Sequence, residues 1–354
     1  MNINRRLLLG TGAAAAATAL GQLRPKRAQA EIRSKQSGSV VNLYTSRHYD
    51  TDEELYNSFE RITGISINRI EAGADELIER IKAEGDNSPA DILMTVDAGR
   101  LWRADQEGIF TPVSSSTLEE KIPSYLRHPE GHWFGFSKRA RVIMYNKDVV
   151  DPSELSTYEA LVDSQWQGRI LIRSSSNIYN LSLAGSLIEA HGVPETEAWA
   201  TGMVENMARE PEGNDTAQIR AAAAGLGDIA IANTYYLARI MKSDAEEDQE
   251  VADKMRVFFP NQEGRGTHVN ISGAGVVASS PRKEAAIQFL EYLASPIAQV
   301  FFAQGNNEYP VVEGTALDPV VASFGSFKED TVSASVFGEN NSEALQMYDR
   351  AGWQ

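Results

Sequence analysis

From residue 40 onward, short apolar runs alternate with segments in which apolar residues recur every three or four positions. The short runs, bounded by polar residues, predict strands at residues 40–44, 65–70, 90–96, 169–172 and 228–232. The helical spacing predicts a helix through Leu101 and Trp102 and further helices at residues 52–61, 75–83, 177–191 and 235–241. Strands that alternate with helices in this way predict an α/β protein with parallel sheets. The acidic stretch 244–250 is expected to be a solvated helix face or a loop.

The length of 354 residues predicts two domains, since a domain takes about 100–200 residues. The hydrophobic share of 42% and the charged share of 23% are ordinary for a globular protein that buries a core. The chain has no cysteine, which excludes disulfides, thiolate metal sites and iron–sulfur clusters.

The first thirty residues have the pattern of an export signal. Arg5 and Arg6 precede a mild apolar run at residues 7–21, which is too short to span a bilayer as a stable helix. The small residues at 28–30 then provide a cleavage site. The arginine pair resembles a twin-arginine signal, although Leu8 stands where such signals usually have Phe, so an ordinary Sec signal stays open. We expect residues 1–30 to be removed and the mature chain to lie in the periplasm without insertion into the membrane.

The net charge of the chain bears on whether it binds nucleic acid. The formal charge is −16, and removal of residues 1–30, which hold five cations and no acid, takes it to −21. A protein that follows nucleic-acid phosphates needs a basic surface, so no nucleic-acid partner is expected. The acidity is compatible with a soluble protein or a cation binder and does not choose between them.

Three of the predicted strand-to-helix turns carry tyrosines beside polar residues that favour helix starts, at residues 45–50, 174–180 and 233–236. Asp50 or Thr51 is expected to cap the first of the three helices. In open α/β sheets, ligands bind beyond the carboxyl ends of the strands, where these turns lie. The turns hold Tyr49, Tyr179, Tyr235 and Tyr236. On these grounds alone the chain is a periplasmic solute-binding protein whose ligand is not identified.

Three other functions share some of these features. A binder of polyamines or other organic cations would have the same export and acidity, but should show an aromatic box with carboxylates. A sulfate or phosphate binder would use serine-rich helix starts, which residues 174–176 allow. A secreted metallohydrolase would need clustered histidines and carboxylates; the five histidines, at 48, 128, 132, 191 and 268, show no ligand spacing.

Five segments resemble the periplasmic ferric-iron-binding proteins of iron ABC transporters, in particular their FutA-type cyanobacterial branch. The similarity runs from about residue 40 to about residue 348. The segments that carry it are LYTSRHYDTD at 43–52, ADILMTVDAGR at 90–100, NTYY at 233–236, GTHVNISG at 266–273 and NEYPV at 307–311.

This resemblance implies a type II periplasmic-binding-protein fold, in which hinge strands join two α/β lobes around a ligand cleft. The first lobe would comprise residues 31–137 and 262–309, and the second residues 138–261 and 310–354. It also implies that the chain is not an enzyme, and that as a monomer it would deliver iron to an inner-membrane ABC permease.

The resemblance further implies that the four turn phenolates hold the iron, as Fe³⁺ and with Fe²⁺ as a further candidate. Tyr49 would come from the first lobe, and Tyr179, Tyr235 and Tyr236 from the second. His48 matches a position that is a ligand in some members, and we rank it below Tyr49 because neighbouring side chains in extended backbone point opposite ways. In one branch of the family a carboxylate and a bound phosphate replace two tyrosines, but an apolar residue, Leu93, stands near that position here.

Ferric iron is a hard cation that prefers anionic oxygen ligands. Four phenolates and Fe³⁺ carry a net charge of −1, and buried excess charge is costly unless it is paired. We expect Arg139 and Arg239 to lie behind the tyrosines and offset this charge. Arg47 and Arg141 are expected to be surface cations without a role.

Overall fold

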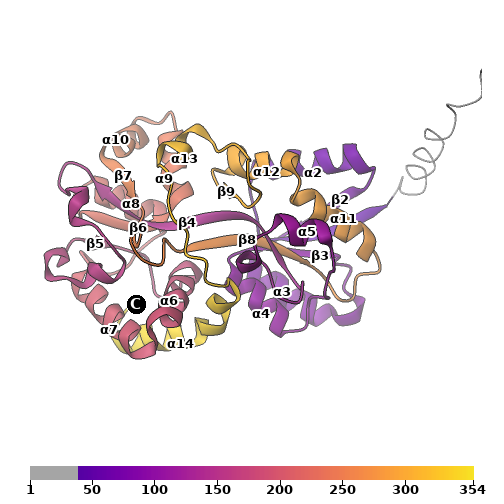
Figure 1. The fold of residues 1–354 in the computed structure, drawn as a ribbon, viewed down its shortest axis with the longest axis horizontal. Coiled ribbons are helices and arrows are strands. Elements are labelled where there is room, and N and C mark those ends of the chain that lie inside the picture. Colours follow the sequence, from indigo (N-terminus) through magenta and orange to yellow (C-terminus); the bar gives the residue numbers. More distant parts are fainter. Residues whose placement is uncertain (1–38) are drawn as a thin grey trace, which may run out of the picture.

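The computed structural model of the protein describes residues 39–354, so the predicted signal at residues 1–30 lies outside the described part. Figure 1 shows two groups of elements side by side along the long axis. The strands are β1 Val40–Thr45, β2 Ser66–Glu71, β3 Ile92–Val96, β4 Phe134–Asn146, β5 Ile170–Leu171, β6 Ile229–Asn233, β7 Met255–Phe258, β8 Val269–Val276 and β9 Tyr309–Pro310. The α-helices are α2 Asp50–Thr63, α3 Ala74–Glu84, α4 Ala98–Gln106, α5 Ser116–Lys121, α6 Ile178–His191, α7 Val193–Asn206, α8 Asp215–Ala223, α9 Thr234–Met241, α10 Glu246–Lys254, α11 Lys283–Leu293, α12 Pro296–Val300, α13 Pro319–Ser323 and α14 Ser335–Ala351.

The predicted strands and helices are confirmed to within a few residues. Apolar spacing sets the helices: Leu55 and Phe59 of α2 are buried, and so are Leu77, Ile78 and Ile81 of α3. A glycine in the left-handed conformation, Gly64, ends α2, where a side chain would be strained. The acidic stretch at 244–250 leads into α10, as expected for a solvated helix.

The sheet is mixed, so the prediction of parallel sheets is only partly right. The strand order is β2-β1-β3-β8-β4-β6-β5, and β7 and β9 also pair with β4. The predicted strand–helix–strand units do pair in parallel, as β1 with β2, β1 with β3 and β5 with β6. The antiparallel pairs all involve β4 or β8, two long strands that the pattern did not predict.

Strand β4 connects the two groups of elements. Its first half, up to Ala140, pairs with β8, and its second half, from Arg141, pairs with β6 and β7. Figure 1 shows β4 and β8 running along the long axis between the two groups. A strand that changes partner midway holds both groups in one sheet, and nearly every residue along β4 is buried.

Three clusters of buried apolar side chains form the interior. The first core gathers β1, β3, α2–α4 and α11, with members such as Leu43, Leu93 and Phe289. The second core lies between β4, β5, β6, α6, α7 and α14, and the third between β4, β6, α8 and α9. The first core therefore belongs to the right-hand group in Figure 1, and the second and third cores to the left-hand group.

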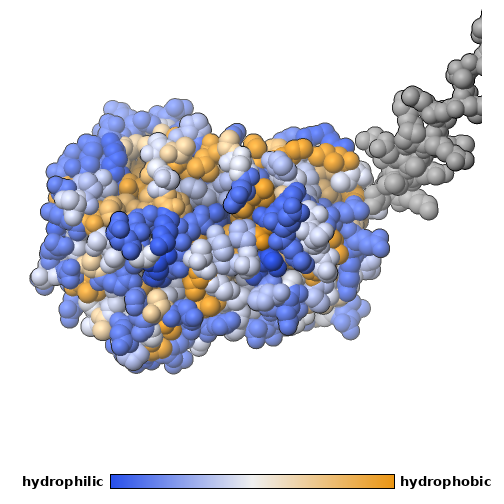
Figure 2. Space-filling view, in the orientation of Figure 1, coloured by the Kyte–Doolittle hydropathy of each residue, from blue (hydrophilic) through white to orange (hydrophobic). Residues whose placement is uncertain are grey.

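Within residues 39–354, no single helix is long and apolar enough to cross a membrane. Two consecutive helical segments, Lys283–Leu293 and Pro296–Gly305, are together long and apolar enough, but they are bent by 55° relative to each other. Figure 2 shows a mostly hydrophilic face on which apolar residues are scattered, with a hollow apolar area over α9 and α13.

Candidate metal centre

The candidate ligand tyrosines all lie at helix N-termini. Tyr49 is the N-cap residue of α2, Tyr179 is the second residue of α6, and Tyr235 and Tyr236 are the second and third residues of α9. The N-terminal end of a helix carries partial positive charge, which favours an anionic group such as a phenolate. The three helix starts therefore contribute positive partial charge that would help to hold phenolates formed on binding a cation.

The helix starts differ in how they are capped. Asn177 caps α6, and its side-chain oxygen accepts a hydrogen bond from the backbone N–H of Tyr179 at 3.1 Å. The prediction that Asp50 or Thr51 caps α2 is wrong, because that helix already begins at Asp50 and its N-cap is Tyr49. The Tyr49 side chain makes no cap hydrogen bond to the backbone of α2, because the ring places its hydroxyl oxygen too far from the N–H groups of the first turn.

The structure brings these phenols together. The hydroxyl oxygens of Tyr235 and Tyr179 lie 3.4 Å apart, and the rings of Tyr235 and Tyr236 have centroids 4.3 Å apart. Tyr49 comes from the side of the first core, and the guanidinium carbon of Arg239 lies 5.0 Å from the ring centroids of both Tyr49 and Tyr235. Four phenols from three helices therefore surround one region between the two groups of elements.

Burial raises the pKa of three of these phenols, Tyr49, Tyr235 and Tyr236. Burial raises the pKa of Tyr235 well above 10, and the neighbouring phenols of Tyr179, Tyr236 and Tyr49 raise it further. Burial also raises the pKa of Tyr49, and the carboxylate of Glu308 adds to this effect. The pKa of Tyr236 is raised first by burial and then by Tyr179. These three phenols are therefore neutral at neutral pH until a strong cation displaces their protons.

A buried ion-pair network lies beside the tyrosines. The Glu308 carboxylate accepts hydrogen bonds from Arg47 at 3.1 Å and from Arg139 at 2.7 Å, and Arg47 also pairs with Asp52 at 2.9 Å. Burial alone would raise the pKa of Glu308, but the two guanidinium groups lower it below its usual value. The prediction that Arg47 is a surface cation is wrong, because Arg47 is buried. Its partner Glu308 stands 261 residues further along the chain, which is why the local sequence did not reveal the pair.

Arg139 faces the tyrosines with part of its hydrogen-bonding capacity unused. Besides Glu308 it donates to the Ser272 hydroxyl, while its Nε and Nη1 atoms are buried and have no hydrogen-bond partner among residues 39–354. Burial lowers the pKa of Arg139, but the Glu308 carboxylate, followed by the phenols of Tyr235, Tyr49 and Tyr179, holds it above its usual value.

Arg141 is also buried, so its prediction as a surface cation is wrong as well. It donates to Asp215 at 2.9 Å and to the side-chain oxygen of Asn180 at 2.6 Å, and Arg173 pairs with the same Asp215 at 2.8 Å. Asn180 follows Tyr179 directly, so this network fixes the start of α6.

Comparison with known proteins places the chain in a family. The profile described as "Bacterial extracellular solute-binding protein" matches residues 54–329, more than three quarters of the chain. The chain belongs to this solute-binding family. The family is extracellular, which agrees with the predicted periplasmic location, and membership of a family of binding proteins confirms that the chain is not an enzyme.

Individual relatives of this solute-binding protein point to iron. It is 54% identical to "Iron uptake protein A2" of Synechocystis over 99% of both chains. It is 26% identical to the "Fe(3+)-binding periplasmic protein" of Serratia marcescens over 91% of this chain and 93% of that one. A solved structure from Trichodesmium, described as IdiA (FutA) in complex with iron and citrate ligands, shares 64% identity, covers 89% of this chain and 100% of its own, and superposes with a TM-score of 0.88. The predicted fold and the resemblance to the FutA-type branch are confirmed.

His48 of this solute-binding protein lies apart from the tyrosines. Its side chain is 56% exposed, and its Nδ1 atom is 3.5 Å from a carboxylate oxygen of Glu71. Tyr49 has extended backbone, with φ −102° and ψ 130°, so the two side chains diverge as expected.

One cluster contradicts the statement that the histidines lack ligand spacing. Asp105, His128 and His132 offer ligand atoms within 4.8 Å of one another, and the two imidazole rings stack at 4.6 Å. The backbone N–H of Glu130 donates to His128 Nδ1 at 3.2 Å, which leaves the proton of the neutral ring on Nε2, 3.4 Å from Asp105. His132 is hydrogen-bonded to the largely buried Asp105 carboxylate, and His128 faces the same carboxylate at 3.4 Å, so both imidazoles already have an acidic partner and give a hydrolytic metal site no support.

The serine-rich turn before α6 uses its own polar groups. The backbone N–H of Ser175 donates to the carbonyl of Gln354, and that of Ser176 to the Ser174 hydroxyl. The N–H of Asn177 donates to the Ser174 carbonyl. An oxyanion would have to displace these bonds, so the structure does not favour the anion-binding alternative.

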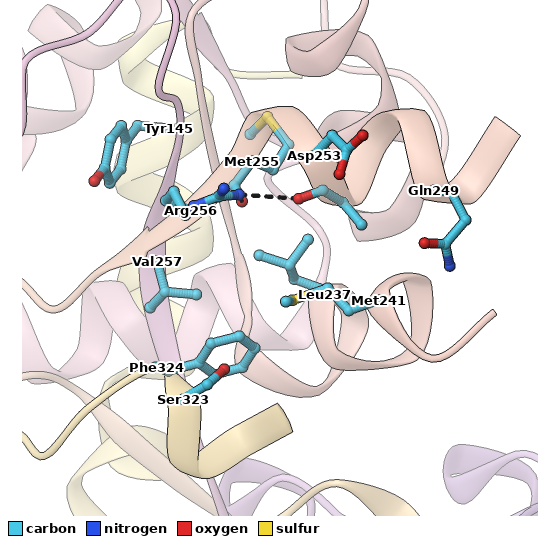
Figure 3. A pocket seen from close by; sticks show the side chains of 11 residues that line it. Tyr145, Leu237, Met241, Gln249, Asp253, Met255, Arg256, Val257, Ser323 and Phe324 are labelled. Atoms are coloured by element: carbon cyan, nitrogen blue, oxygen red, sulfur yellow. Dashed lines mark hydrogen bonds between the residues drawn. The ribbon is translucent and has the colours of Figure 1, made fainter. Parts of the chain in front are cut away.

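A surface pocket of 490 Å³ lies between β7 and helices α9, α10 and α13, and none of the four candidate ligand tyrosines lines it. Figure 3 shows apolar side chains such as Leu237, Val257 and Phe324 along it, while Arg256 donates to the Ala252 carbonyl at 2.9 Å. Its lining offers no converging oxygen ligands for a hard cation.

Proposed function

We propose that the mature protein captures one ferric ion between its two lobes and delivers it to an inner-membrane ABC permease. The phenolates of Tyr49, Tyr179, Tyr235 and Tyr236 would bind the ion. The observation that carries this proposal is the convergence of the four phenols, with the Tyr235 and Tyr179 oxygens 3.4 Å apart. Such a set of oxygen ligands suits Fe³⁺ better than softer cations, and it agrees with the iron named for the relatives.

The lobes are proposed as residues 31–137 with 262–309 and residues 138–261 with 310–354. The separation of the first core from the second and third supports this division for most of the chain. The exceptions are Val311, Ala334 and Phe337, which join the first core, and Val269 and Tyr309, which join the third. Tyr49 would then come from one lobe and the other three ligands from the second, so binding requires both lobes to meet. We rank His48 as a weaker ligand, because it faces Glu71.

The proposed charge balance uses Arg239 and Arg139. Arg239 has no carboxylate within 4 Å in the described part of the chain and stacks on Tyr49 and Tyr235. Arg139 is already paired with Glu308, so Arg239 is the better candidate to offset the extra negative charge of the site, above all with Fe²⁺.

Dialysis of the purified mature chain against ferric citrate, sulfate and spermidine, in separate experiments, tests the proposal against its alternatives. We expect the chain to retain one iron and to retain neither sulfate nor spermidine. Retention of sulfate or spermidine without iron would replace the proposal by an oxyanion or organic-cation binder.

We propose that the protein is exported by the twin-arginine route. After cleavage of the signal it is proposed to be a monomer without a membrane anchor. Replacement of Arg5 and Arg6 by lysines should then block export of a reporter fused to residues 1–30. Unchanged export would favour the Sec route.

A further inference from the structure

Asp97 is a buried carboxylate with unusual backbone geometry at the end of β3. It is fully buried, and its φ of 80° and ψ of 127° are strained for a residue with a side chain. Such strain persists only where the surroundings enforce it, and it clusters at functional sites. Neither the candidate ligands nor the arginines beside them contact Asp97 through a hydrogen bond in the described residues.

Two of the hydrogen bonds to Asp97 fix it within the frame of α4 and β8. Its Oδ1 accepts from the backbone N–H of Gly99 at 2.8 Å, and its Oδ2 accepts from Asn270 Nδ2 at 2.9 Å. The backbone N–H of Asp97 donates to the Ile271 carbonyl at 2.8 Å. Asp97 is therefore held against β8 and the start of α4 by bonds that do not involve α6.

A third hydrogen bond comes from the other side of the molecule. The hydroxyl of Ser182 donates to Asp97 Oδ1 at 2.7 Å, and Ser182 is fully buried. Ser182 lies on α6, whose Leu183 belongs to the second core, whereas Leu101 of α4 belongs to the first core. This bond therefore crosses from one group of elements to the other.

The helices around this bond pack closely, with glycines that leave room for side chains or backbone of the facing helix. A Cβ atom on Gly99 of α4 would lie 2.4 Å from the Asn341 side chain of α14, and one on Gly338 would lie 2.4 Å from Trp102. On α6, a Cβ on Gly185 would lie 3.1 Å from Phe337. The close packing leaves the Asp97–Ser182 hydrogen bond enclosed between α4, α6 and α14, so a change in the relative position of the two groups of elements would act on it directly.

We propose that Asp97 and Ser182 form a latch between the lobes, made when the cleft closes and broken when it opens. The proposal rests on the proposed function, because closure around iron is what the latch would hold. On opening, water replaces the Ser182 hydroxyl, while Gly99 and Asn270 keep Asp97 in place. The latch is a positioning device that slows iron release without touching the metal.

The first test compares Ser182→Ala with a matched control, Ser186→Ala. Ser186 lies one turn further along α6 and is equally buried. Its hydroxyl donates to the Leu183 carbonyl of its own helix and accepts a long hydrogen bond of 3.5 Å from Arg265, and it makes no bond to Asp97. Iron release from the loaded protein to a strong chelator should be about ten- to a hundredfold faster in Ser182→Ala, because one hydrogen bond to a buried carboxylate is lost in the closed state only. Equal release rates in the two variants would overturn the latch.

The second test needs no iron. The natural chain has no cysteine, so spin labels at Ile62→Cys and Val149→Cys, two exposed positions on the first and second lobes, report the distance between lobes without background. We expect Ser182→Ala to lose the short-distance population relative to Ser186→Ala, and identical distance distributions would overturn the latch. If the wild-type chain retained no iron, the proposed function would fall, and the label distances would still decide whether the latch exists.

Discussion

At the scale of single residues, the account depends on phenol oxygens that are neutral before the metal arrives. Because burial raises the pKa of Tyr235 and Tyr236, binding must release protons from both at neutral pH. The affinity for iron should therefore rise with pH. The cations around the site then help to hold the phenolates once they have formed.

Tyrosine-to-phenylalanine variants rank the ligands. Tyr235→Phe or Tyr236→Phe should lose most affinity and colour, since each keeps the ring and removes only the coordinating oxygen. Tyr179→Phe and Tyr49→Phe should weaken binding strongly, and His48→Ala should have a smaller effect, because His48 is exposed and faces Glu71. Iron titration followed by absorbance measures each affinity.

Tyr145→Phe is the control for this series, because Tyr145 lines the distant pocket of Figure 3. It should bind iron like the wild type. If His48→Ala abolished binding while Tyr49→Phe left it intact, the assignment of ligands in the first turn would be reversed.

The arginines should set the preference between oxidation states. Arg239→Ala removes a positive charge beside the site, which destabilises the more negative Fe²⁺ complex more than the Fe³⁺ complex. The reduction potential of the bound iron should fall by about 40 mV, which corresponds to roughly 1 kcal/mol for one electron at a partly solvated position. Arg139→Ala should act in the same direction but also destabilise the fold, because it breaks the buried pair with Glu308. Redox titration of both variants measures this, and an unchanged or higher potential in both would rule the mechanism out.

At the scale of elements, the start of α6 positions one ligand. Asn177→Ala removes the cap on the Tyr179 N–H and should lower the free energy of unfolding by about 1 kcal/mol. It should also weaken iron binding, because the turn that carries Tyr179 loosens. Urea unfolding and iron titration measure the two effects.

Ser115→Ala is the control, because it removes a cap from α5 in which the Ser115 hydroxyl accepts from the Leu118 N–H, together with the bond that this hydroxyl donates to Glu291 at 2.6 Å. It should lower stability by at least as much and leave iron affinity unchanged. Equal iron affinity in Asn177→Ala and Ser115→Ala would show that the α6 cap does not position the ligand.

Local sequence patterns predicted the helices and strands better than they predicted which strands pair and which charged residues form ion pairs. Apolar spacing located α2 and α6, and the turn motifs located the four tyrosines, because both signals lie within a few neighbouring residues. The antiparallel pairing of β4 and β8 was not predicted, since it depends on strands more than a hundred residues apart. The burial of Arg47 was missed for the same reason, because its partner Glu308 is remote in sequence; the segment 307–311 attracted attention only through the resemblance.

At the scale of the whole molecule, ligands on both lobes make closure a condition of binding. Iron should stabilise the fold by about 2.7 kcal/mol at a free concentration one hundred times the dissociation constant. It should also reduce the radius of gyration, because the lobes approach each other. Calorimetry and solution scattering with and without iron measure both changes, and equal melting temperatures or equal radii would contradict closure.

The most direct test of the central claim is metal analysis of the purified mature protein together with its visible spectrum. After incubation with ferric citrate and dialysis, we expect one iron per chain and a visible band from charge transfer between phenolate and iron, which Tyr235→Phe should weaken or abolish. A colourless protein without stoichiometric iron would contradict the account.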